Sequence, residues 1–161
     1  MNSEIYIRPL AEDDANLSYK WRNDSEVWKY TGSRPAREIT AAQEREWIRE
    51  VLSRPSEKRF AICLIGTDEY IGNVQLTGIT KNEAEFHIFI GAKKYWGRGY
   101  GTAATRLGLD FAFESLNLKR VLLEVKKSNV SAIRAYEKAG FTDTGDCDSL
   151  TYRFEIHANS S

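Results

Sequence analysis

A short run with two glycines, Arg98-Gly99-Tyr100-Gly101-Thr102, is the stretch of this sequence best suited to binding an anion. It follows a segment with the alternating pattern of a strand and precedes one with the apolar period of a helix. At such a turn the unpaired amides of the first helical turn and the positive end of the helix dipole point to one place. Glycine lets a phosphate approach the backbone closely, and Lys93 and Lys94 add positive charge nearby. The run therefore predicts a phosphate site.

The run differs from two familiar nucleotide-binding motifs. A Walker loop requires GxxxxGKS/T, whereas here Gly97 is followed by Arg98-Gly99. A Rossmann fingerprint requires a third glycine where Thr102 stands, and it belongs to the first turn of a parallel sheet. A nucleotide-binding α/β enzyme therefore stays an alternative interpretation, which predicts stabilisation by ATP or NAD.

Acid–base groups occur just before the glycine run. Glu85 and His87 are two residues apart in a segment of strand pattern, so both side chains should lie on one face of that strand. Either could accept a proton from a substrate, directly or through water. Glu124, on a neighbouring predicted strand, is a third candidate. The plainer alternative is that the two glutamates are rim or solvated carboxylates and that His87 is a half-buried strand residue.

The elements that must position these residues follow from the hydrophobic pattern. Residues 5–10 predict a strand that Pro9 ends, and Asp13 or Asp14 could cap a helix that reaches about Arg22. Thr40 and Gln43 have the spacing of a capping box that opens a second helix, up to about residue 52. Residues 24–39 between these helices predict a long loop or a broken helix, whose Trp28 and Tyr30 could form a wall of the substrate site.

The second half of the chain predicts most of a sheet. Short turns join strands at residues 59–65, 70–79 and 83–90, so these strands should be antiparallel. A helix at residues 102–115 then crosses to a strand at 120–125, which should lie parallel to 83–90. A helix at 129–139 and a hairpin of residues 141–146 and 151–157 complete an α/β fold on a mixed sheet.

Composition narrows the class of protein. The chain has 161 residues and no formal net charge, which disfavours a nucleic-acid partner. It has no apolar stretch of membrane-spanning length and no leader pattern, so we expect a cytoplasmic enzyme without membrane contact. Cys63 and Cys147 lack metal-ligand spacing, and we expect no metal site. We expect one domain over residues 1–158, with a frayed tail at 159–161, as a monomer or homodimer.

A second segment identifies a family. Residues 98–103 match the pattern R/Q-x-x-G-x-G/A, and about thirty residues later comes Asn129-Val130-Ser131-Ala132-Ile133-Arg134-Ala135-Tyr136-Glu137-Lys138-Ala139-Gly140-Phe141. This pair resembles the GNAT superfamily of acetyltransferases. The opening Ile7-Arg8-Pro9-Leu10 and the stretch Trp21-Arg22-Asn23-Asp24 extend the similarity to the whole chain. They resemble the Rim-type branch, whose members acetylate protein N-termini, polyamines, drug amines or amino-sugar nucleotides.

The resemblance implies a mostly antiparallel sheet flanked by about four helices, with a V-shaped split between its two parallel strands. It implies acetyl-CoA as cofactor, with its pantetheine arm in the split, and a small-molecule or peptide amine as acceptor. In the family a β-bulge in the strand before the glycine turn presents backbone amides to the cofactor. The residues that the resemblance assigns to cofactor binding are Ile88, Phe89, Ile90, Arg98, Gly99, Tyr100, Gly101, Thr102 and Asn129.

The chemistry that follows is direct acetyl transfer to a neutral amine. A lysine-like amine costs roughly 4.6 kcal/mol to deprotonate at pH 7, so Glu85 or His87 is useful as a base. Tyr136 matches a position that often protonates the leaving thiolate, and its helical spacing puts it on the side of Asn129. A core aromatic is the alternative interpretation of Tyr136. A CoA-binding module of the same fold without catalysis is the alternative to an enzyme.

Overall fold

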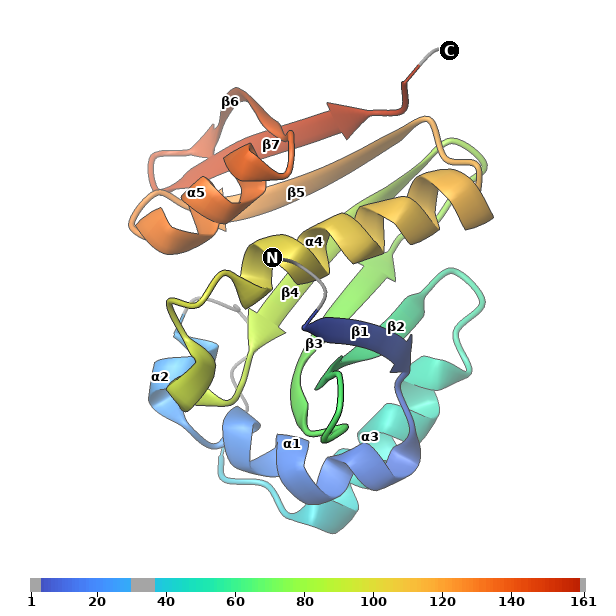
Figure 1. The fold of residues 1–161 in the computed structure, drawn as a ribbon, viewed down its shortest axis with the longest axis vertical. Helices are drawn as coiled ribbons and strands as arrows, with labels where there is room; N and C mark the ends of the chain where they lie inside the picture. The colour runs from blue at the N-terminus through green and yellow to red at the C-terminus, as the bar shows by residue number, and fades with distance from the viewer. Residues whose placement is uncertain (1–3, 30–36, 160–161) are drawn as a thin grey trace.

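The computed structural model describes residues 4–29 and 37–159, whose strands form one seven-stranded sheet in the order β1-β2-β3-β4-β5-β7-β6 (Figure 1). Neighbouring strands are antiparallel except β4 and β5, which are parallel. This confirms the predicted α/β class and its mixed, mostly antiparallel sheet. The strands are β1 (Ile5–Pro9), β2 (Lys58–Leu64), β3 (Tyr70–Thr77), β4 (Glu83–Ile90), β5 (Arg120–Lys126), β6 (Thr142–Asp148) and β7 (Thr151–His157).

The two parallel strands separate soon after they meet. In the described chain β4 and β5 pair over three residues, from Glu83 with Arg120 to Glu85 with Leu122. Beyond that point β4 stays paired with β3 as far as Ile90, and β5 stays paired with β7 as far as Lys126. The predicted V-shaped split is therefore present, and it opens toward the carboxyl ends of both strands.

Helices cover both faces of the sheet, and each face has its own core. Helices α4 and α5 pack with Val74, Phe86 and Val121 on one face, while α1 and α3 pack with Ala61 and Cys63 on the other. Figure 1 shows α4 passing in front of β4 and the end of β3, and α5 beside β5 and the β6–β7 hairpin. The α-helices of the described ranges are α1 (Ala15–Arg22), α2 (Ser25–Trp28), α3 (Ala41–Leu52), α4 (Tyr100–Asp110) and α5 (Val130–Lys138), with short η1 (Glu12–Asp14), η2 (Lys93–Tyr95) and π-helical η3 (Phe111–Ser115).

Local signals in the sequence predicted several helix ends and missed others. Thr40 and Gln43 form the expected capping box of α3, with bonds of 2.9 and 3.1 Å. Asp14 precedes α1 but does not cap it, because its carboxylate binds the Ala11 amide and Arg8 instead. The helix predicted at 102–115 begins earlier, at Tyr100, and its last five residues widen into the π-helical turn η3.

The segment predicted as a loop or broken helix at residues 24–39 contains α2, and its residues 30–36, with Tyr30, lie outside the described residues. Within residues 4–29 and 37–159 no helix is long and apolar enough to cross a lipid bilayer.

Two glycines place the end of β4 against its neighbours. A Cβ on Gly72 of β3 would lie 2.3 Å from the carbonyl oxygen of Phe89, and one on Gly91 would lie 2.0 Å from the Trp21 ring. Real Cβ atoms do not approach so closely, so β3, the exit of β4 and α1 can pack this tightly only without side chains at these positions. The close packing fixes the end of β4 relative to α1.

Candidate active site

A cavity of about 220 Å³ lies at the split. Helices α1, α2 and α3 line it on one side, and β2, β3, β4 and β5 contribute side chains to its wall. It reaches Tyr136 of α5, which packs in the core of the opposite face. One cavity therefore connects the two faces of the sheet at the point where β4 and β5 stop pairing.

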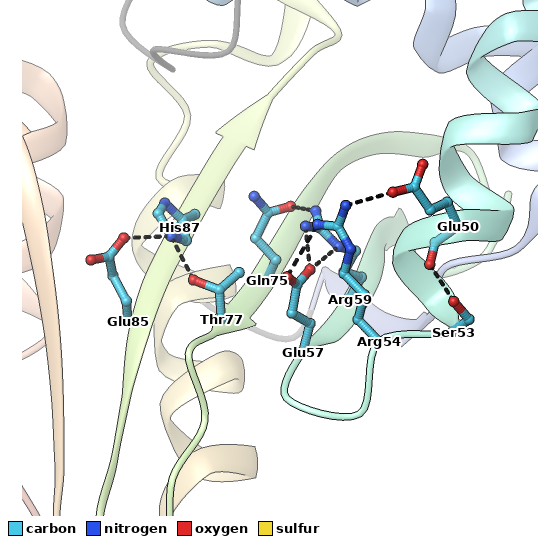
Figure 2. Close-up of polar contacts among 9 residues, drawn as sticks. All are labelled: Glu50, Ser53, Arg54, Glu57, Arg59, Gln75, Thr77, Glu85 and His87. Atoms are coloured by element: carbon cyan, nitrogen blue, oxygen red, sulfur yellow. Dashed lines mark hydrogen bonds and ion pairs between the residues drawn. The ribbon is translucent and has the colours of Figure 1, made fainter.

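His87 lies on the wall of this cavity with one ring nitrogen anchored. Its Nε2 is 2.9 Å from Glu85 Oε1 and 3.1 Å from Thr77 Oγ1 (Figure 2). A carboxylate only accepts hydrogen bonds, so Nε2 carries the proton of the neutral ring and Nδ1 has a free lone pair. Nδ1 makes no hydrogen bond to any described residue. Burial lowers the pKa of His87 below its ordinary 6.5, although the charge of Glu85 opposes this effect.

Glu85 and Glu124, the carboxylates considered as bases, take different places. Glu85 shares a strand face with His87 as predicted, but it stands behind the ring and is not among the described residues that line the cavity. Glu124 of β5 lines the cavity and is exposed. His87 therefore lines the cavity, and Glu85 holds its ring from outside the cavity lining.

Tyr136 lies on the far wall of the same cavity. Its side chain is 7% exposed and packs edge-on against Phe86 and Phe141, with ring centroids 6.3 and 5.7 Å apart. Its hydroxyl makes no hydrogen bond within residues 4–29 and 37–159. Burial raises the pKa of Tyr136 well above 10, so it keeps its proton at neutral pH. Both interpretations of Tyr136 describe part of its setting, because the ring is core and the residue also lines the cavity.

The edge of β4 that faces the split presents unpaired backbone groups. The Gly91 amide donates to Ile71 of β3, and backbone groups alternate along a strand, so those of Ile88 and Ile90 point toward β5. The β4–β5 ladder ends at Glu85, before either of them. The bulge that the resemblance implied within β4 is absent from its described pairing with β3. Instead, the Gly91 and Ala92 amides both bind Ile71 oxygen, at 2.8 and 3.1 Å, just past the strand.

The glycine turn has the shape expected of an anion site. Gly97 and Gly99 have φ values of 75° and 82°, which favour glycine, whereas Gly101 lies within α4 and has no positive φ. A Cβ on any of the three would meet no described atom within 4 Å. Internal packing therefore does not explain a glycine at position 101, and the space beside it is free for a phosphate.

The charged side chains near the turn differ in whether they are already paired with a carboxylate. Lys93 is held by Asp24 and Glu26 at 2.8 and 3.1 Å, and Lys94 lies 3.4 Å from Glu69. Arg98 lies over the Tyr95 ring and forms no ion pair with a described carboxylate. Of these three cations, Arg98 alone has no carboxylate partner among the described residues.

The other residues predicted to bind the cofactor are brought to the same region with different local roles. Ile88 and Phe89 line the cavity, and Ile90 oxygen accepts a hydrogen bond from Trp96 at 2.7 Å. Tyr100 turns its hydroxyl to Glu4, and Thr102 lies in the first turn of α4. Asn129 caps α5 by accepting from the Ala132 amide at 3.4 Å.

Sequence reasoning missed the wall formed by α1, α3 and β2. Arg22 Nε and Glu44 Oε1 are buried 3.7 Å apart, and neither atom has a hydrogen-bond partner in the described chain. Burial raises the pKa of Glu44, against the opposing effects of Ser18 and Arg22. The available signal was a charged residue at a core position of α3, where Trp47, Ile48 and Val51 continue the apolar face.

Comparison with known proteins agrees with this geometry. Residues 4–142 match a family model described as an acetyltransferase (GNAT) domain. The chain is 31% identical to spermidine N(1)-acetyltransferase of Escherichia coli over 95% of the chain and 79% of that protein. It is 34% identical to a probable N-acetyltransferase, YjcK, of Bacillus subtilis over 88% of the chain and 82% of that protein. A solved spermidine N-acetyltransferase from Vibrio cholerae, in complex with CoA and spermine, superposes with a TM-score of 0.86 at 25% identity, covering 96% of both chains.

Proposed function

Because the chain belongs to the GNAT acetyltransferase family and is an acetyl-CoA-dependent N-acetyltransferase, we propose that its acceptor is a small primary amine bound in the cavity between His87 and Tyr136. The observation that carries this proposal is that one cavity is lined by a neutral histidine with a free ring nitrogen and by a protonated tyrosine. These are the two proton-transfer groups that acetyl transfer to an amine requires.

The residues present fit acetyl-CoA, which when bound supplies an acetyl group activated as a thioester. We assign its pyrophosphate to the space beside Gly101, at the amino end of α4 and next to Arg98. The backbone groups of Ile88 and the amide of Ile90 have no partner in β5 and can hold an extended amide-containing arm as a neighbouring strand would. Asn129 stands at the carboxyl side of the same split.

Each proton has a defined place in the proposed reaction. His87 Nδ1 takes the proton that the attacking amine loses as its nitrogen bonds to the acetyl carbon, and Glu85 stabilises the resulting imidazolium. Tyr136 gives its proton to sulfur as the carbon–sulfur bond breaks, and it regains a proton from water. CoA has an ordinary thiol pKa of about 8.5, so a neutral tyrosine is a suitable donor.

The branch within the family is part of the proposal. The motif resemblance favours the Rim-type branch, and two relatives are named for spermidine. Both observations support an amine as acceptor, since peptides, polyamines and amino sugars all offer one. The wall residues that distinguish these acceptors lie mainly on α1, α3 and β3.

An acetyl-CoA consumption assay across peptide N-termini, spermidine, aminoglycosides, amino sugars and amino-sugar nucleotides tests the activity. We expect acetylation of at least one small amine, together with a rise in melting temperature with CoA and none with ATP or NAD. Binding of CoA without acetylation of any amine would contradict the proposed acceptor and support a CoA-binding role. Stabilisation by ATP or NAD in place of CoA would contradict the cofactor assignment.

A further inference from the structure

Resting on the proposed function, we infer that the acceptor carries a hydroxyl or carbonyl oxygen close to its amine, and that Gln75 recognises this oxygen. The acceptor is then an amino sugar or a similar oxygen-bearing amine, in contrast to a linear polyamine. Gln75 lies on β3 directly opposite His87 on β4, and both side chains line the cavity. An amine at His87 therefore brings its neighbouring atoms to Gln75.

The orientation of the Gln75 amide is determined by its partner. Gln75 Oε1 accepts a hydrogen bond from Arg59 Nη1 at 2.7 Å. A guanidinium has donors only, so the oxygen of the amide must face Arg59 and its NH₂ group must face away. Figure 2 shows this nitrogen on the side of His87. It makes no hydrogen bond to the described residues, and it therefore offers a donor to an acceptor atom of the substrate.

Arg59 is itself held in place. Its Nε and Nη2 donate to Glu57 at 3.1 and 2.6 Å, and its side chain is 7% exposed. Arg59 also lies over the Trp47 ring. The charge of Glu57 is thereby neutralised, and the amide of Gln75 is presented by a rigid support.

A second amide on the wall offers the same kind of donor. The Asn73 side chain, 8% exposed, also lines the cavity, and its oxygen accepts from Tyr70 and leaves its amide nitrogen as a donor. Arg22 and Glu44 line the same cavity as an ion pair, with Nε and Oε1 3.7 Å apart and neither atom hydrogen-bonded within the described residues. A hydroxyl can accept a hydrogen bond from Arg22 Nε and donate one to Glu44 Oε1.

His87, the proposed base, also suits an acceptor with oxygen atoms near its amine. Electron-withdrawing oxygens near an amine lower its pKa below that of an alkylamine. Because burial lowers the pKa of His87, His87 deprotonates a weakly basic ammonium more readily than a strongly basic one.

The decisive measurement is kcat/KM on matched amines. Glucosamine has its amine between two hydroxyls, cyclohexylamine keeps a six-membered ring without oxygen, and spermidine is a linear polycation. We expect the parent enzyme to prefer glucosamine over both by roughly tenfold or more. Gln75→Met should lower the activity on glucosamine about tenfold more than the activity on cyclohexylamine.

The variant Gln75→Glu inverts the proposed contact. One carboxylate oxygen can still accept from Arg59, while the other replaces the NH₂ donor by an acceptor. Activity on glucosamine should fall roughly tenfold to a hundredfold, and activity on spermidine should rise. Asn82→Asp makes the same change of charge on an exposed turn outside the cavity. It should change neither the activity on glucosamine nor the activity on spermidine.

The outcomes separate this inference from the proposed function. Equal or better turnover of spermidine or cyclohexylamine by the parent, or equal losses on all three amines in Gln75→Met, would overturn the role of Gln75 and leave the acetyltransferase activity intact. Acetylation of no amine at all, with CoA binding retained, would overturn both. Circular dichroism and melting temperatures of each variant show whether a loss comes from unfolding.

Discussion

The two regions proposed to hold the cofactor and the acceptor are built in opposite ways. On the cofactor side, recognition groups belong to the backbone: the amide edge of β4 beyond Glu85, and a turn where a Cβ on Gly101 would meet no described atom. On the acceptor side they belong to side chains that hold one another, as Arg59 does with Glu57 and Gln75. The cofactor side is open because Gly101 has no side chain, whereas the acceptor side is rigid because its side chains hydrogen-bond to one another.

This difference indicates which part of the site determines specificity for the acceptor. A cofactor common to many enzymes can be bound by backbone geometry, which depends on a few glycines and little else. An acceptor is selected by side chains whose direction depends on neighbours in other strands and helices. The predictions below test each side, beginning with the backbone.

Gly101→Val should have the largest effect, because its side chain occupies the space assigned to the cofactor phosphate. We expect CoA to bind at least about 100-fold more weakly, or about 2.7 kcal/mol, by titration calorimetry. Gly101→Ala is the milder comparison, since alanine favours a helix and should not lower the melting temperature. Undiminished affinity in a folded Gly101→Val protein would contradict the phosphate assignment.

Tyr136→Phe removes one oxygen and keeps the ring in the core. The hydroxyl has no hydrogen-bond partner in the described chain, so stability should hold, while kcat falls roughly tenfold to a thousandfold. The KM for acetyl-CoA should change little. Parental turnover on a confirmed acceptor would show that Tyr136 only packs and that water protonates the sulfur.

The pH profile tests His87. The base works when neutral, and burial lowers its pKa, so kcat/KM should stay high as pH falls and decline only at a midpoint below 6.5. His87→Gln should remove this acidic limb and lower kcat/KM by roughly a hundredfold at neutral pH. An unchanged limb in the variant would assign the titration to another group, with Glu124 the next to replace.

Glu85→Gln should have the smallest effect, since this carboxylate orients a ring without lining the cavity. We expect roughly a tenfold loss in kcat from a less stabilised imidazolium. Glu85 raises the pKa of His87, so its removal should move the acidic limb of kcat/KM to lower pH. Loss of the acidic limb in this variant would indicate that Glu85, and not His87, is the titrating base.

The local structure of the glycine turn and of β4 could be predicted from the sequence, whereas the wall of α1, α3 and β2 could not. Gly99 and Gly101 lie within one turn, and the helix that follows them can be read locally, so their joint role needs no tertiary information. The face shared by Glu85 and His87 follows from the period of a strand.

The remaining parts depend on contacts between segments distant in sequence. Gln75 is orientated by Arg59, which is sixteen positions away, and Glu44 meets Ser18, which is twenty-six positions away. No local pattern specifies such a register. The helix predicted at 102–115 begins earlier, at Tyr100, and ends at Ser115 as predicted. The π-helical form of its last five residues was not predicted, because a π-helical turn has no strong signal in propensity.

The short ladder between β4 and β5 makes the sheet easiest to separate between these two strands. The sheet is in effect two smaller sheets, of four and three strands, joined by three residue pairs and by helix packing. A cofactor arm lying in the split would bind backbone on both edges and act as a missing strand between them. Binding of the cofactor should therefore raise the cooperativity of unfolding and slow amide exchange at Ile88 and Ile90. Acetyl-CoA would then complete the sheet beside which the amine acceptor binds.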